Sequence, residues 1–170
     1  MRATHSWLSL LLLTLALSAC GWQLRGAPVS LAIGSMSLSG GSFDIKDVLT
    51  EALESSDISV SSQAKYRLRL ENERFDRRTV AVDAQGRTAE IELNYFINWL
   101  LLDSDGEPLT ERGRVNLSRH VHYDPDNTTA SSDEERATKD AMYEDAAWQI
   151  LRQLNAASAY LLGHNASAAP

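Results

Sequence analysis

The sequence has little cysteine, a shortage of basic residues and no apolar run long enough for a membrane-spanning helix. Its one cysteine is Cys20, so an internal disulfide framework is excluded. The 16 lysines and arginines are outnumbered by 23 aspartates and glutamates, which gives a formal net charge of −7. So acidic a chain is a poor ligand for a phosphate backbone, and we expect no nucleic-acid partner.

Sequence motifs for catalysis are also missing. There is no Gly-x-Ser-x-Gly elbow, and Gly40-Gly41 is not followed by the Lys-Ser/Thr of a phosphate cradle. Glu90 and Glu92 could form a carboxylate pair, but they belong to an expected solvent-facing strand face where nothing would raise a pKa. We therefore expect a protein that is not an enzyme, with no catalytic residues and no cofactor.

A histidine pair gives the best case for a metal site. Strand alternation would put His120, His122 and Asp124 on one face, and histidines two residues apart can share a metal. The alternative is a solvated polar strand face, which we favour because no further ligand cluster is visible. We expect no metal site, and a metal-binding lipoprotein that uses His120 and His122 stays as the alternative.

What is present begins at the N-terminus. Arg2 is followed by an apolar stretch at residues 7–17 and then by Leu17-Ser18-Ala19-Cys20. A charged start, an apolar core too short to span a membrane and small residues before a cysteine predict a lipoprotein signal at residues 1–19. We expect cleavage before Cys20, lipidation of Cys20 and a tether at residues 20–28. Two or more acyl chains hold a protein stably at a membrane. The residue after the cysteine is Gly21 rather than the aspartate that commonly retains a lipoprotein at the inner membrane, so we expect the outer membrane.

Hydrophobic periodicity predicts the order strand, helix, three strands, helix. Alternation marks strands at residues 29–38, 66–71, 88–102 and 112–123, and a helical period marks residues 44–54 and 132–163. Amphipathic helices and half-apolar strands satisfy each other as an α+β two-layer sandwich, with two helices on one face of a roughly four-stranded mixed sheet. We expect one domain at residues 29–163 and a disordered tail at 164–170.

Capping residues suggest where the two helices begin and end. Asp44 is the expected N-cap of the first helix, with Asp47 in the capping-box position. Ser132 with Glu135 predicts a capping box for the last helix, and Gly163 can end it. Met142 and Trp148 lie off the apolar stripe of that helix. They either pack at its edge or contact a partner.

Arginines gather in and around the first hairpin, in a chain that is otherwise acidic. They are Arg67, Arg69, Arg74, Arg77, Arg78 and Arg87. Arginine binds phosphate or carboxylate through two parallel hydrogen bonds. The alternative is a solvated strand face on which arginine stems cover the sheet.

Four segments carry a resemblance to a known family. They read CGWQLRG at 20–26, QGRTAE at 85–90, YDP at 123–125 and MYEDAAWQILRQL at 142–154. In this order and spacing the chain resembles LptE, the family of lipopolysaccharide-assembly lipoproteins that partner the outer-membrane barrel LptD.

The resemblance implies a non-enzymatic plug seated largely inside the barrel. Such a protein would be anchored by its lipid at the outer membrane, with its domain facing the periplasm and the barrel lumen. It would help insert lipopolysaccharide into the outer leaflet. We expect Arg87, with Arg77 and Arg78 near the same turn, to meet phosphates of the glycolipid. A different outer-membrane assembly accessory is a further alternative.

Overall fold

A computed structural model describes residues 33–167 of the chain. The elements in order are β1 (Ser35–Gly40), α2 (Phe43–Glu54), β2 (Ser59–Val60), β3 (Tyr66–Val82), β4 (Thr88–Leu102), β5 (Gly113–His122) and α3 (Thr128–Ser167). The predicted signal, Cys20, the tether and the start of the first predicted strand lie outside the described residues. Within the described part, no helix is both long and apolar enough to cross a membrane.

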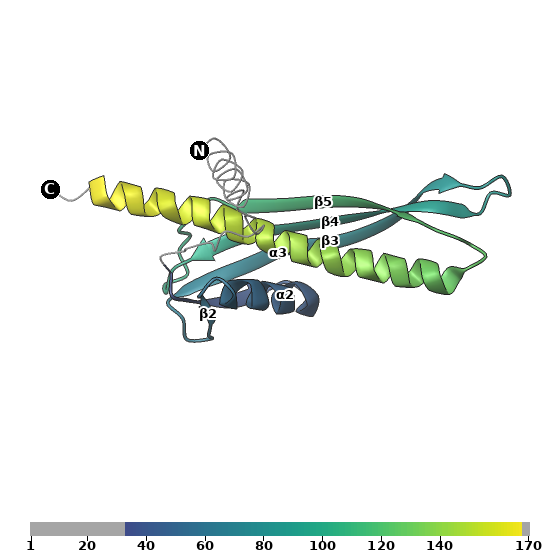
Figure 1. Cartoon of the computed structure of the whole chain (residues 1–170). Coiled ribbons are helices and arrows are strands. Elements are labelled where there is room, and N and C mark those ends of the chain that lie inside the picture. The colour runs from purple at the N-terminus through teal and green to yellow at the C-terminus, as the bar shows by residue number, and fades with distance from the viewer. Residues whose placement is uncertain (1–32, 168–170) are drawn as a thin grey trace, which may run out of the picture.

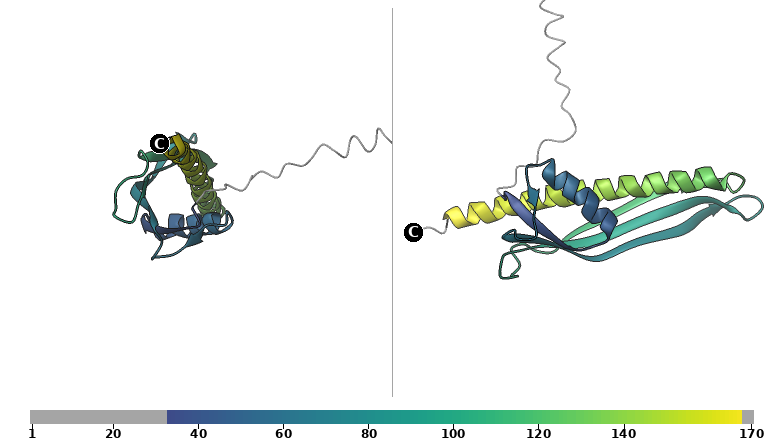
Figure 2. Two further views of the ribbon diagram at one scale, coloured as in Figure 1. Left: turned by 90° about the vertical axis from the view of Figure 1, so that its left-hand side faces the viewer. Right: turned by 90° about the horizontal axis from the view of Figure 1, so that it is seen from below.

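The strands form one mixed sheet in the order β2-β1-β3-β4-β5. β1 is parallel to β2 and to β3, while β3, β4 and β5 form an antiparallel meander. Helices α2 and α3 cover one face of this sheet, and α3 runs along its length (Figures 1 and 2). The predicted α+β sandwich is confirmed. The sheet has five strands, rather than about four, because Ser59–Val60 lies outside the predicted strands and pairs with β1.

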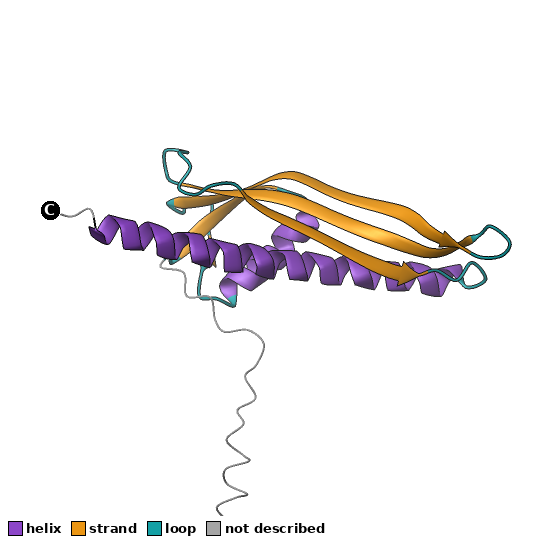
Figure 3. Cartoon of the chain, turned by 90° about the horizontal axis from the view of Figure 1, so that it is seen from above, coloured by secondary structure: helices purple, strands orange, loops and turns teal. Residues whose placement is uncertain are grey.

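The core lies between the sheet and the helices, and Figure 3 shows these two layers from above. On β4 the odd-numbered apolar residues face the helices, and Ile91, Leu93, Tyr95 and Ile97 are fully buried. The predicted apolar stripes are confirmed: Ile45, Leu49 and Leu53 are buried on α2, as are Ala146, Ile150 and Leu154 on α3. Met142, expected at the edge of α3, is also fully buried, whereas Trp148 is 37% exposed.

β3 continues well beyond the predicted residues 66–71. Its alternation changes phase at a bulge, where the register shifts between Glu71 and Arg74 and Asn72 has a φ of 53°. An inserted residue moves the following side chains to the opposite face, which hides the strand from a period-two reading. A turn ends the strand, and in it the Asp83 side chain accepts from the backbone N–H groups of Gln85 and Arg87.

Helix α2 begins earlier than predicted. Its N-cap is Ser42, whose backbone is extended and whose side chain accepts from the backbone N–H of Ile45 at 3.5 Å. The prediction that Asp44 is the N-cap was therefore wrong. A tertiary contact favours the earlier start, because the Glu73 carboxylate of β3 accepts from the backbone N–H and the hydroxyl of Ser42.

Helix α3 also begins earlier, at Thr128 rather than Ser132. The Asn127 side chain accepts from the backbone N–H of Ala130 at 3.4 Å, so the capping box of Ser132 and Glu135 was wrong. The helix passes Gly163 and continues to Ser167, so the glycine does not end it. Residues 164–167 thus belong to α3, and residues 168–170 lie outside the described part.

Candidate functional site

The tip of the β3–β4 hairpin meets the loop that leads into α3. Arg87 follows the hairpin turn, and its Nε donates to Asp83 Oδ2 at 2.8 Å. Its two terminal nitrogens donate to the Asp126 carboxylate at 2.7 and 3.4 Å. The backbone N–H of Tyr123 donates to Ala89 O at 2.9 Å and brings the loop to the hairpin. The turn and the start of α3 thus lie at one end of the molecule (Figure 1).

Two carboxylates surround the guanidinium of Arg87 at this tip. Hydrogen bonds to Asp126 and Asp83 raise the pKa of Arg87 above its ordinary value, so it stays charged. The Asp126 side chain is 75% exposed, and its carboxylate meets the outer edge of the guanidinium with both oxygens. A phosphate can make the same paired contact. In this structure Asp126 fills that edge of the guanidinium.

Arg77 lies on the helix-covered face of the sheet. Its Nε donates to both oxygens of Glu135 on α3, at 3.2 and 3.1 Å. Its guanidinium also lies 5.7 Å from the centre of the Tyr123 ring. These contacts join the outer part of β3 to the first turns of α3.

Arg78 lies on the opposite, uncovered face. It pairs across the strands with Glu92 of β4, which also accepts from Asn94 at 3.1 Å and from Ser118 at 3.0 Å. Hydrogen bonds from Arg78, then Asn94 and Ser118, lower the pKa of Glu92 to about 2. This carboxylate is therefore ionised at neutral pH and links β3, β4 and β5 through side chains.

The structure does not bring the three predicted arginines together. Arg77 and Arg78 are consecutive on one strand, so their side chains point to opposite faces, and Arg87 alone lies at the tip. Each forms an ion pair that the sequence did not predict: Arg77 with Glu135, Arg78 with Glu92 and Arg87 with Asp126. Two of these partners come from α3 or the loop before it, so sequence proximity gives no signal for them.

His120, the first residue of the histidine pair, lies against two glutamates of β4. His120 Nδ1 lies 2.8 Å from Glu90 Oε1, and its Nε2 lies 3.6 Å from Glu92 Oε1. The Asp124 carboxylate turns back into the loop and accepts from the backbone N–H of Asp126. The described residues contain no group of three or more His, Cys, Asp or Glu placed to hold a metal ion.

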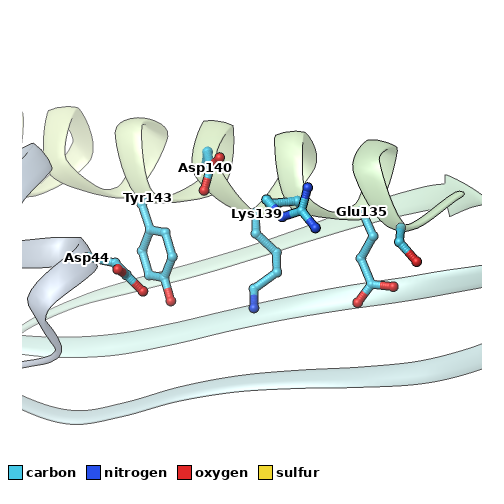
Figure 4. Close-up of a pocket in the computed structure, with 7 residues that line it drawn as sticks. Asp44, Glu135, Lys139, Asp140 and Tyr143 are labelled. Atoms are coloured by element: carbon cyan, nitrogen blue, oxygen red, sulfur yellow. The ribbon is translucent and has the colours of Figure 1, made fainter. Parts of the chain in front are cut away.

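A shallow groove lies on the helix side, between the start of α2 and the first half of α3. Figure 4 shows Tyr143, Lys139 and Glu135 reaching from α3 toward the strands, with Asp44 approaching from α2. Lys139 Nζ lies 4.8 Å from the centre of the Phe75 ring. Burial, then Asp44, raises the pKa of Tyr143. Acidic and basic side chains both line the groove, and they come from the start of α2 and the first half of α3.

Comparison with known proteins finds one matching family. The LptE family model, described as lipopolysaccharide-assembly, matches residues 29–154. No curated protein sequence matches the chain.

Solved structures share its fold. Lipoprotein B from Nitrosomonas europaea is 23% identical, with a TM-score of 0.69 over 85% of this chain and 96% of that one. Rare lipoprotein B from Shewanella oneidensis is 24% identical, with a TM-score of 0.64 over 75% of this chain and 98% of that one. A minor lipoprotein from Acinetobacter baumannii is 22% identical, with a TM-score of 0.64 over 74% and 93%. These three structures establish the fold alone.

Proposed function

The chain belongs to the LptE family of non-enzymatic lipopolysaccharide-assembly lipoproteins, and from this membership we propose that it plugs the outer-membrane barrel LptD. The observation that carries the proposal is the family match over residues 29–154, which includes β1 to β5, α2 and most of α3. In this proposal Cys20 carries the lipid that keeps the domain at the outer membrane. The folded domain then faces the periplasm and enters the barrel lumen.

The distribution of polar groups supports this role. The uncovered face of the sheet carries ion pairs: Arg78 with Glu92 joins β3 to β4, and Arg69 pairs with Glu71 within β3. Such a face is stable in water and needs no apolar cover. A hydrated barrel lumen can accept it, and the barrel wall can cover the exposed strand edges that would otherwise invite aggregation.

Co-purification tests the barrel partner. The full lipoprotein, tagged at its C-terminus and extracted in mild detergent from its own cells, should retain LptD identified by mass spectrometry. A chain with Cys20→Ser should be released from the membrane, because it lacks the acyl chains that anchor a lipoprotein. Retention of no barrel by the wild-type chain contradicts the proposal.

The proposed glycolipid contact is Arg87 at the hairpin tip. Its outer nitrogens face an exposed carboxylate that a lipopolysaccharide phosphate can replace. Arg77 and Arg78 would act as separate contacts on the two faces, each after release from Glu135 or Glu92. We therefore expect Arg87 to contribute most, because the carboxylate that it must release is the most exposed of the three.

Binding of the detergent-solubilised lipoprotein to lipopolysaccharide tests this ranking. Arg87→Glu should weaken binding about tenfold, the effect of losing one charge-assisted contact of ~1.5 kcal/mol. Arg77→Glu and Arg78→Glu should weaken it less. Asp126→Asn should strengthen binding, because it removes the competing carboxylate. Arg119→Glu is the matched control, since Arg119 pairs with Asp145 away from the tip. Equal affinity of the Arg87→Glu and Arg119→Glu variants overturns the assignment.

A further inference from the structure

The uncovered face of the sheet carries a second arginine arrangement, distinct from the hairpin tip. Phe96 of β4 is half-buried on this face, and two guanidiniums lie against its ring. Arg74 Cζ lies 5.1 Å from the ring centre and Arg114 Cζ lies 5.7 Å from it. Arg74 comes from β3, where it pairs with Phe96, and Arg114 comes from β5, where it pairs with Asn98.

Neither arginine has a carboxylate within 4.0 Å among the side chains that the structure describes. This is notable in a chain with a net charge of −7. The nearby acids of the face serve other arginines. Glu71 pairs with Arg69 and Arg112, and Glu92 pairs with Arg78. Arg74 and Arg114 are both exposed, and among the described residues their guanidiniums contact the face of an aromatic ring instead of a carboxylate.

An unsatisfied polar atom lies beside this pair. Asn98 is 6% exposed, and its Oδ1 is buried without a hydrogen-bond partner in the described part of the chain. A buried acceptor without a partner costs about 1–3 kcal/mol, and a carboxylate ligand, which only accepts, leaves it unpaired. The groups that a ligand can reach on this face are therefore the two guanidiniums and the ring of Phe96.

We propose that Arg74, Phe96 and Arg114 form a docking surface for an acidic segment of a protein partner, with two carboxylates bound by the two arginines. For the identity of the partner this rests on the proposed function, so the segment belongs to the barrel LptD. The two arginines come from strands on either side of β4, which stand roughly 9.5 Å apart. That separation suits two carboxylates better than one phosphate group. Side chains two residues apart on an extended segment are spaced by roughly 6.6 Å, within reach of both guanidiniums.

Crosslinking at Asn116 reads out the occupant of this surface. Asn116 is exposed and lies opposite Phe96 in the β4–β5 register. A photoreactive residue placed there in the full lipoprotein, in its own cells, should form an adduct with an acidic segment of LptD. An adduct with lipopolysaccharide, an adduct with a second copy, or no adduct overturns the proposal.

Charge removal tests the role of the arginines. Arg74→Gln with Arg114→Gln should reduce LptD retention about tenfold, since two charge contacts are lost. The matched control is Arg119→Gln with Arg136→Gln, which removes the same charge from two exposed ion pairs elsewhere. Both double variants should keep the unfolding midpoint of the wild type, since their changes lie on exposed side chains.

The outcomes separate the two claims. If the wild type retains the barrel and both double variants retain it equally, the docking surface is wrong while the proposed function stands. If the wild type retains no barrel, the proposed function fails and this inference fails with it. Lower retention by the Arg74 and Arg114 variant alone, restored when both positions are lysine, supports the surface.

Discussion

The two faces of β4 differ sharply although one strand builds both. On the helix-covered face Tyr95 is fully buried and packs 5.8 Å from Phe75 and 5.1 Å from Tyr143, centre to centre. On the uncovered face the next residue, Phe96, is half-buried between two guanidiniums. Because successive side chains on a strand point to opposite sides, neighbouring aromatic residues acquire opposite roles.

The two faces differ in what stabilises them: the covered face is apolar and buried, whereas the uncovered face is charged. The covered face is closed by α2 and α3, and the Glu73 carboxylate beside its aromatic residues is held by Ser42 and Tyr95. Burial, then Glu73, raises the pKa of Tyr95, so its hydroxyl stays protonated as a donor. The uncovered face is held together by ion pairs in contact with water. Such pairs contribute little stability each and are available to a partner.

The largest expected effect comes from truncating the covered face. Leu93→Ala removes a fully buried side chain of β4 and should lower the free energy of unfolding by about 2–5 kcal/mol. Urea unfolding followed by circular dichroism measures it. Asn116→Ala, on the exposed side of β5, is the control and should stay within about 0.5 kcal/mol of the wild type. Similar losses for both variants would contradict the division between the faces.

Adding volume to the covered face should have a smaller effect. A Cβ at Gly113 would lie 2.0 Å from Cε2 of the Trp99 ring, so the ring must move. Gly113→Ala should cost about 1–3 kcal/mol and shift the tryptophan fluorescence, because Trp99 would leave its hydrogen bond to Gln153. Gly34→Ala is the matched control, since a Cβ there meets nothing within 4 Å. Unchanged fluorescence and stability for Gly113→Ala would show that the β5–α3 packing is looser than described.

The smallest expected effect concerns pH on the uncovered face. Arg78 and two other donors hold the pKa of Glu92 at about 2, below its ordinary value of 4.5. A lowered folded-state pKa adds stability that is fully present above about 4.5 and is lost as pH falls toward about 2. Urea midpoints across this range should fall more steeply for the wild type than for Glu92→Gln. Parallel curves would show that Glu92 is not held in this way.

Much of the architecture could be predicted from periodicity. The residues 88–102 predicted as a strand are β4, and the predicted apolar stripes of both helices are the buried ones. The far half of β3 could not be found in this way, because the bulge at Asn72 changes its phase and charged residues then occupy both faces. The start of α2 was misplaced because the Glu73 contact that favours Ser42 comes from a strand distant in sequence.

The candidate site was predicted only in part. The sequence identified Arg87 as a residue at a hairpin tip, and the structure places it there beside Asp83. It also grouped Arg77 and Arg78 with Arg87, but the strand separates the first two onto opposite faces. The pairing of Phe96 with Arg74 and Arg114 joins three strands, and its members are 22 and 18 positions from Phe96 in the chain. No local pattern marks such a contact.

The sequence by itself determined the apolar side of both helices and of β4, the class of fold and the family. These properties depend on local periodicity and short motifs, which the order of residues contains directly. Only the tertiary structure decided which charges meet: Arg87 with Asp126, Arg77 with Glu135, and Arg74 and Arg114 with a ring instead of an acid. The physical reason is that ion pairs and cation–π contacts act over a few ångströms between strands and helices. Register, bulges and helix placement set those distances, and each depends on the packing of the whole domain.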